Sequence, residues 1–352
     1  MALNEHQYSL IKNTLIAVLS LIIIVTFSYI FAEILAMLIV SFLIALIFNP
    51  VVDFIERRGL PRLAAVLFVF FLTGFLIFSA VSFLMPKIVN QFNLLAAAIT
   101  PENFKSLINQ FESSFKKIFP FMNSVSLADK LTGFFQNMIL GWVNNITNII
   151  YSIFSLIAIV VIVPFMTFFL LKDNTRLVKG LVNIMPNKYF EVSYWVIHKI
   201  SIELGRYVRG WILDAFLVGL LSGCGLALLG IQNAASIGFI AGVGHLIPYF
   251  GPIIGGIPAI LISIVQFGNF SMLPNIVLLF LLVYTIDNGF IQPHVFSKST
   301  DMHPLIIILL IIIGSQTIGI LGMLFAVPAA TVIKTASREI YLGYKNYKII
   351  RA

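Results

Sequence analysis

Residues 242–259 read Gly-Val-Gly-His-Leu-Ile-Pro-Tyr-Phe-Gly-Pro-Ile-Ile-Gly-Gly-Ile-Pro-Ala, which places five glycines and three prolines inside an apolar run. A straight membrane helix cannot pass through Pro248, Gly251 and Pro252 without losing backbone hydrogen bonds. At membrane depth such a break is tolerated only where protein or a water-filled cavity satisfies the freed backbone groups. If the surrounding sequence is that of a membrane protein, this stretch predicts a broken segment that lines an internal site.

The composition is that of a helical membrane protein. The chain has 352 residues, of which 60% are hydrophobic and 36 are charged (22 Lys plus Arg and 14 Asp plus Glu), and its mean hydropathy is +1.03. A soluble domain usually carries about 45–50% apolar residues. The composition excludes a soluble enzyme, a disordered tail, a secreted disulfide scaffold and a nucleic-acid binder. Cys224 is the only cysteine, so one chain can form neither a disulfide nor a cysteine metal site.

A helix needs about 20 apolar residues to cross the bilayer core. The sequence predicts an all-α, polytopic membrane protein with six plain spans and two Gly/Pro-broken segments, which are either re-entrant hairpins or kinked spans. The plain spans are Leu15–Tyr29, Ile34–Phe48, Leu63–Leu84, Ile149–Leu171, Trp211–Leu229 and Ile276–Ile291, and the broken segments are Ala234–Phe267 and Pro304–Ile333. The chain contains no Walker loop, no HExxH motif and no dinucleotide fingerprint, so we expect neither an enzyme nor a cofactor nor ATP-driven transport.

Basic residues predict the orientation. Sixteen Lys and Arg residues, which include Lys12, Arg62 and Lys345, fall on one side if the spans cross as described. That side is the cytoplasm, so both termini are expected there, in the inner (plasma) membrane of a bacterium. The chain then divides into three N-terminal spans (1–85), an outer segment (86–146), a fourth span with a cytoplasmic helix (147–210), a transport core (211–336) and a basic tail (337–352). Two amphipathic helices in the outer segment favour a homo-oligomer.

The second broken segment resembles the first. It is interrupted around Gly314, Gly319 and Gly322, and it contains an apolar-Pro-Ala triplet at Val327, like the triplet at Ile257 in the first segment. Each broken segment follows a plain span, which is a weak internal repeat. As hairpins the two units would be inverted copies, an arrangement common in secondary transporters, and Lys298 would face the cytoplasm. A plainer interpretation is that the glycines, such as Gly219 with Gly223 and Gly238 with Gly242, only allow close helix packing.

Several of these motifs together resemble a known family. They are Asn49-Pro50 with Asp53, Arg58-Gly59 and Pro61-Arg62; Gly205-Arg206-Tyr207 with Arg209-Gly210; Pro248-Tyr249-Phe250-Gly251-Pro252 with Gly255 and Pro258-Ala259; Asp287-Asn288 with Gln292-Pro293, Ser297-Lys298-Ser299 and His303-Pro304-Leu305; and Gly319 with Gly322-Met323 and Ala326-Val327-Pro328. In this order, over residues 40–335, they are similar to the autoinducer-2 exporter family, also called PerM-like permeases. Trp211 departs from the pattern, in which a small polar residue or glutamine is expected. The resemblance implies a multi-span inner-membrane protein without ATPase parts. Some members are associated with autoinducer-2 export and others with sodium or lithium/proton antiport.

Polar residues inside the apolar segments are the candidate site. Asp287, beside Asn288 and five residues before Gln292, lies deep in an apolar span, where an ionisable side chain costs about 2.5–3.5 kcal/mol. A carboxylate with amide oxygens can hold a proton or a small cation; the alternative is a buried acid that serves packing. We expect the substrate or ion pathway where the two breaks meet, and its other candidate residues are Asp214, His245, Pro248, Tyr249, Gly251, Pro252, Gly255, Pro258, Gln316, Thr317, Gly319 and Gly322. His294 and His303 predict no metal site.

Three functions remain open. The first is secondary or facilitated export of a small polar metabolite, which the family resemblance suggests is autoinducer-2 or a similar solute of quorum sensing. The second is exchange of sodium or lithium for protons, which needs a titrating acid such as Asp287. The third is a non-transporting membrane scaffold, which would need neither Asp287 nor two proline breaks at membrane depth. The expected partners are therefore the bilayer and a small polar solute, monovalent cation or proton, and no nucleic acid.

Overall fold

The structure, a computed structural model, describes residue 26 and residues 31–98, 153–186, 190–296 and 302–346. These residues form helices and no strand, which confirms the all-α fold. The helices are α2 (Ala32–Glu56), α3 (Arg62–Ala98), α6 (Ile153–Lys172), α7 (Asn174–Asn183), α8 (Phe190–Leu228), α9 (Ala234–His245), α10 (Gly251–Phe267), α11 (Leu273–Ile286), the π-helical turn η2 (Asp287–Ile291), α12 (Gln292–Phe296), α13 (Pro304–Ile318) and α14 (Ile320–Asn346). The predicted first span apart from residue 26, the two outer amphipathic helices and Lys298 lie outside the described residues.

Several helices are long and apolar enough to cross a membrane, which confirms a polytopic protein. Within the described residues they are Ile34–Glu56, Arg62–Asn90, Phe190–Leu228, Leu273–Phe296 and Ile320–Gly343. With 39 residues, α8 is roughly 58 Å long at about 1.5 Å per residue, nearly twice the bilayer core of about 30 Å. The predicted cytoplasmic helix and fifth span are thus one continuous helix. Helix α3 likewise continues past residue 85 to Ala98.

The first broken segment is a helical hairpin. Helix α9 ends at His245, and α10 begins at Gly251 after the break Leu246–Phe250. Gly255 packs on Ala241, and Gly244 lies against Ile254. At the far ends, the Gln266 amide donates to the carbonyl of Gly230 (2.8 Å) and accepts from the backbone N–H of Gln232 (2.9 Å). These pairs show that α9 and α10 run antiparallel.

The second broken segment is a hairpin as well. Helix α13 ends at a single turn residue, Gly319, whose φ of 64° and ψ of −136° suit only glycine. Gly314 and Gly322, on either side of the turn, lie in backbone contact. Each hairpin follows a long helix, and each apolar-Pro-Ala triplet lies inside the second helix of its hairpin. The internal repeat seen in the sequence is thus a structural repeat of a span followed by a hairpin.

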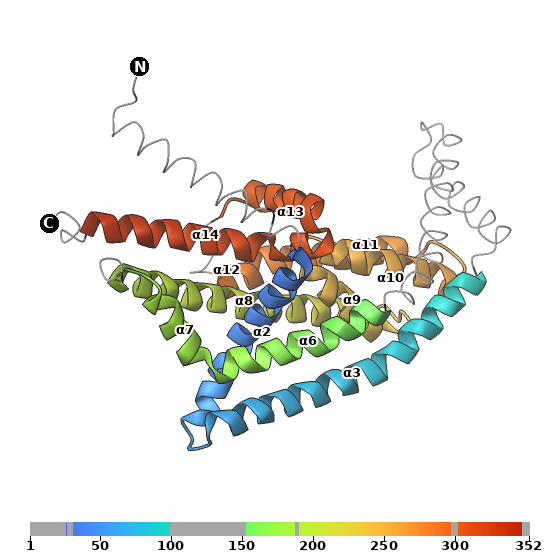
Figure 1. Cartoon of the computed structure of the whole chain (residues 1–352). Helices are drawn as coiled ribbons and strands as arrows, with labels where there is room; N and C mark the ends of the chain where they lie inside the picture. The colour runs from blue at the N-terminus through green and yellow to red at the C-terminus, as the bar shows by residue number, and fades with distance from the viewer. Residues whose placement is uncertain (1–25, 27–30, 99–152, 187–189, 297–301, 347–352) are drawn as a thin grey trace.

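Helix α8 lies in the middle of the molecule, between the α13–α14 hairpin along the upper side of Figure 1 and α3 along the lower side. Its glycines allow α9 to approach closely. A Cβ on Gly219 would lie 2.9 Å from the carbonyl oxygen of Gly238 and 3.0 Å from Cα of Gly242. On another side, Tyr207 and Trp211 of α8 pack with α2 and with Val327 of α14 in one buried cluster. The core therefore surrounds α8 and holds the α8 side chains at this level, Asp214 among them, in the interior.

Helices α2, α3 and α6 are joined by Arg62. Its guanidinium contacts the carboxylates of Asp53 (3.1 Å) and Glu56 (2.8 Å) and donates to the side chain of Asn49 (2.9 Å) and the carbonyl of Leu171 (2.8 Å). The N-terminal motif that begins at Asn49 thus has a structural role at the ends of three helices.

Candidate functional site

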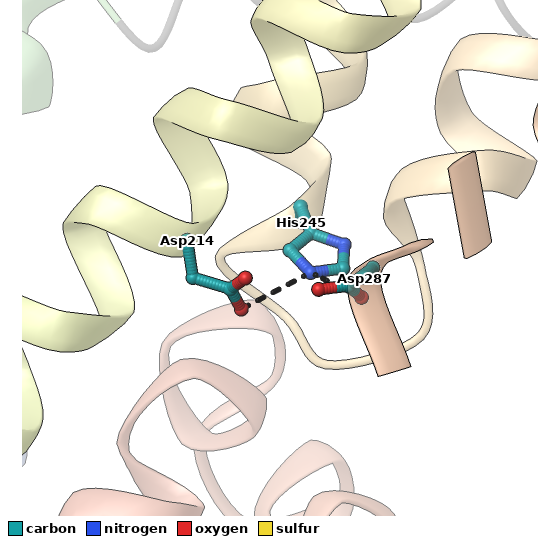
Figure 2. A group of neighbouring side chains, drawn as sticks. All are labelled: Asp214, His245 and Asp287. Carbon is teal, nitrogen blue, oxygen red and sulfur yellow. Dashed lines mark ion pairs between the residues drawn. The ribbon is translucent and has the colours of Figure 1, made fainter. Parts of the chain in front are cut away.

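Three ionisable side chains that are far apart in the sequence converge in the interior. The Nε2 atom of His245 lies 3.4 Å from Oδ2 of Asp214 and 3.3 Å from Oδ2 of Asp287. Figure 2 shows that both carboxylates approach the same nitrogen of the imidazole, Nε2. The exposed fractions are 3% for Asp214, 4% for His245 and 2% for Asp287. We call these three residues the Asp–His–Asp cluster.

The break after α9 places the imidazole. His245 is the last residue of α9, and the next carbonyl, that of Leu246, accepts a hydrogen bond from the Trp211 indole on α8 (2.9 Å). Trp211 precedes Asp214 by one helical turn, so one stretch of α8 supplies a carboxylate to the ring and an anchor to the backbone beside it. On the other side, Gly251 leaves no room for a side chain: a Cβ there would lie 2.6 Å from Nδ1 of His245.

The π-helical turn places Asp287. Asp287 is the first residue of η2, and the backbone N–H of Gln292 donates to the carbonyl of Asp287 in the i to i+5 pattern of a π-helix. This wider turn brings the Gln292 side chain onto the same face, where its Nε2 donates to Oδ2 of Asp287 (3.0 Å). Single π-helical turns within α-helices occur often at functional sites.

The cluster carries more negative than positive charge. Two ionised carboxylates with a neutral imidazole sum to −2, and with an imidazolium to −1. Among the described residues, the ion pairs of both carboxylates are with His245 alone. Oδ1 of Asp214, Oδ1 of Asp287 and Nδ1 of His245 are buried without a hydrogen-bond partner. Burying an uncompensated charge costs several kcal/mol, so the arrangement is suited to binding a cation or a proton.

A groove lies between α10 and α11, and Tyr284 in its wall precedes Asp287 by three residues. Its volume is about 460 Å³, within the usual range of ligand pockets. Among the described residues that line it, the walls are apolar apart from the hydroxyl groups of Tyr249 and Tyr284. Tyr249 is in the break and has a φ of 72°, a left-handed conformation that costs about 1–3 kcal/mol for such a residue and is found mostly at functional positions.

The structure unites some of the predicted site residues. Asp214, His245, Asp287 and Gln292 meet, and Gly251 packs on the imidazole. Asn288 does not join them: it is half-buried, and its amide donates to the carbonyl of Tyr284 in its own helix (2.9 Å). Pro248 and Tyr249 lie in the break, Pro252 is the second residue of α10 and lines the groove, Gly255 packs on α9, and Pro258 is buried within α10.

The second broken segment contributes fewer residues to the site than the sequence predicts. Ile247 and Phe250 of the first break pack on Ile311 and Ala326, in the body of the α13–α14 hairpin. Gln316 and Thr317 are exposed, and Thr317 donates to the carbonyl of Gly314 in its own helix (2.9 Å). Gly319 forms the turn, and Gly322 packs on Gly314. The first break thus meets the side of the second hairpin, and a pathway role for Gln316 and Thr317 stays a prediction.

Two contributors to the site were not predicted. In the sequence, Trp211 appears only as a departure from the family pattern. It lies one helical turn before Asp214, so the two side chains share a face of α8, and the indole N–H is a hydrogen-bond donor. The π-helical turn at Asp287 leaves no signal in the sequence apart from the five-residue spacing to Gln292.

Comparison with known proteins agrees with this architecture. A family model described as AI-2E family transporter matches residues 18–342. The Bacillus subtilis protein YrrI is 26% identical over 305 residues, which cover 84% of each chain, and YueF of the same organism is 28% identical over 303 residues, which cover 82% of this chain and 79% of YueF. PerM of Escherichia coli is 26% identical over 172 residues, which cover 49% of this chain and 48% of PerM. YrrI and YueF are named as candidate transport proteins and PerM as a candidate permease, and no name specifies a solute. The chain belongs to the AI-2E transporter family of multi-span membrane proteins.

Proposed function

We propose that this chain is a secondary transporter in which a cation binds the Asp–His–Asp cluster during transport. The observation that carries the proposal is the convergence of three buried ionisable side chains with a net negative charge. A fold needs no such cluster for stability, because apolar residues of similar size stabilise an interior as well or better. A cation removes the electrostatic cost of the buried carboxylates, and its release restores that cost. Exchange of sodium or lithium for protons is one form of such transport.

The surroundings of the cluster suit a transporter. Each of its residues comes from a different element, α8, the tip of α9 and η2, so movement of the α9–α10 hairpin relative to α8 or η2 changes the distances between the ligands. Breaks within apolar segments form the ion and substrate sites of many secondary transporters. A membrane scaffold would require neither these breaks nor the buried charges.

Export of a small polar metabolite such as autoinducer-2 is the second candidate. The family description and the groove between α10 and α11 favour it. The two functions are compatible, because a cation bound in the cluster can drive the movement of a solute held next to it. We place the protein in a bacterial inner membrane with both termini in the cytoplasm, as the basic residues predict.

The test is cation-driven flux in proteoliposomes that contain the full-length protein. Sodium, lithium and proton gradients are imposed one at a time, and ion flux is recorded for the wild type, Asp287→Asn and Asp173→Asn. Asp173 lies outside the cluster, at the start of α7. At a cation concentration well below saturation we expect Asp287→Asn to reduce the flux roughly 10-fold or more, since a loss of about 1.4 kcal/mol in binding lowers the occupancy of the site tenfold. Asp173→Asn should match the wild type. Full gradient-driven flux in Asp287→Asn would overturn the proposal.

A further inference from the structure

We infer that the Asp–His–Asp cluster is a binding site for a divalent transition-metal ion such as Zn²⁺. The inference rests on the proposed function in one respect, because it takes this ion to be the transported cation. The spacing of the donor atoms, the charge of the cluster and the chemistry of its ligands support it separately.

The spacing is that of ligands around an ion. Nε2 of His245 lies 3.4 and 3.3 Å from the two carboxylate oxygens, and one donor atom from each residue lies within 4.8 Å of the others. A charge-assisted hydrogen bond between imidazole and carboxylate would be about 2.7–2.9 Å long. Two ligands on one tetrahedral zinc ion, with bonds of about 2.0–2.1 Å, lie about 3.3–3.4 Å apart. The two observed nitrogen–oxygen distances fit this ligand spacing. One N–H of the imidazole shared between both carboxylates gives contacts of similar length, and a bound ion would replace that proton.

With the imidazole neutral, as a metal ligand must be, the charge favours a divalent ion. Two carboxylates and a neutral imidazole carry −2, which a divalent cation neutralises completely. A monovalent cation in the same place would leave −1 in an interior where the three side chains are at most 4% exposed. An uncompensated buried charge is costly, so a divalent ion fits this cluster better than sodium or lithium.

The ligand types select among divalent ions. An imidazole nitrogen suits Zn²⁺ and other first-row transition metals, whereas Ca²⁺ requires six to eight oxygens and Mg²⁺ a nearly ideal octahedron. Gln292 donates to the ligating oxygen of Asp287, the kind of outer hydrogen bond that orients metal-binding carboxylates. Three protein ligands leave a fourth tetrahedral position open, which suits an ion that must also be released.

Metal binding by the full-length, tag-free protein in detergent tests the inference. Zn²⁺ binding is measured by equilibrium dialysis, and Co²⁺ is added as a spectroscopic probe, because tetrahedral Co²⁺ absorbs visible light far more strongly than octahedral Co²⁺. We expect one Zn²⁺ per chain and a tetrahedral Co²⁺ spectrum in the wild type. Both should be lost in Asp214→Asn and His245→Gln. Two histidines outside the cluster provide matched controls, since His294 contacts the carbonyl of Phe290 and His303 caps α13, and His294→Gln and His303→Gln should bind as the wild type does.

Absence of saturable Zn²⁺ binding, or binding that survives His245→Gln, would overturn the inference. A separate readout distinguishes its failure from that of the proposed function. If Zn²⁺ does not bind while sodium- or proton-driven flux still requires Asp287, the metal site is wrong and the cation transporter stands. If Zn²⁺ binds with the expected ligands but neither Zn²⁺ flux into the proteoliposomes nor any other cation flux depends on Asp287, the site stands and the ion is not cargo.

Discussion

At the scale of single residues, the geometry of the Asp–His–Asp cluster depends on neighbours that carry no charge. Trp211 fixes the carbonyl that follows His245, Gly251 lets the backbone of α10 contact the ring, and Gln292 holds one oxygen of Asp287. The positions of His245 and Asp287 are thus set by two hydrogen bonds and one missing side chain. Substitution of these neighbours should affect the site without changing its charge.

Trp211→Phe tests the anchor of the break. The variant keeps most of the buried ring area but removes the donor to the carbonyl of Leu246, which should lower the free energy of unfolding by about 1 kcal/mol. We expect a lower thermal unfolding midpoint in detergent and weaker gradient-driven flux. Trp195, on the same helix and 54% exposed, provides the control Trp195→Phe, which should change neither quantity. Unchanged flux and stability in Trp211→Phe would show that the hydrogen bond does not hold the site.

Sequence reasoning found the charged residues of the site individually but not as a group. Asp287 stood out because an acid within an apolar span is costly. Asp214 lies only five residues from Arg209, in a part of the sequence where charged residues are expected at the membrane interface, and a lone histidine has many structural roles. Only the folding of α9 back along α8 brings the three together, and this contact is not encoded in any local pattern.

At the scale of helices, small residues decide how closely the elements pack. A Cβ on Gly238 would lie 2.5 Å from Cα of Gly223, so α8 or α9 must shift if any side chain is added. Gly74 of α3 has no atom within 4 Å of the equivalent point. The spacing of Gly219 with Gly223 and of Gly238 with Gly242 indicated that these positions allow close packing, and the structure shows that the two pairs face each other between α8 and α9.

Gly238→Ala should therefore destabilise the protein by about 1–3 kcal/mol through overpacking. Gly74→Ala makes the same change in open space, where alanine is favoured over glycine by up to about 1 kcal/mol within a helix. Thermal unfolding of both variants in the same detergent measures the difference. Equal midpoints for the two variants would contradict the close packing of α8 on α9.

The hairpin form of the first broken segment also predicts which residues share a membrane side. Gln232 and Asn269 lie just outside the two ends of the hairpin and are exposed. With Cys224 replaced by alanine, single cysteines at the two positions should react with an impermeant thiol reagent from the same side of intact vesicles. Permeabilised vesicles serve as the control for reactivity. Labelling from opposite sides would mean that α9 and α10 cross the membrane as one kinked span.

The sequence left hairpin and kinked span open, because both place the C-terminus on the same side. Glycine and proline mark where a helix ends but not the direction in which the chain continues. The turn at Gly319 illustrates this: Gly314, Gly319 and Gly322 looked alike in the sequence, yet one makes the turn and the other two pack against each other. The direction of each hairpin is set by packing on α8 and within the hairpin itself.

At the scale of the whole molecule, the described helices form a core around α8, in which two span-and-hairpin units lie next to each other. Composition and hydropathy predicted this class of protein, because they report directly on the solvent that surrounds it. The division of the chain at 85, 146, 210 and 336 and the homo-oligomer stay predictions, as do the roles of the amphipathic helices outside the described residues.

The central claim is that Asp214, His245 and Asp287 act as one cation site, and a comparison of single and triple variants tests it most directly. Residues that act as a unit are strongly non-additive: once one is lost, loss of the others adds little. We measure cation-driven flux in proteoliposomes for Asp214→Asn, His245→Gln, Asp287→Asn and the triple variant, with matched protein amounts. The account predicts that each single variant loses nearly as much flux as the triple variant does. If the fold-reductions in flux of the three single variants multiply to give that of the triple variant, the three residues do not form one site. A single variant with full flux would show the same.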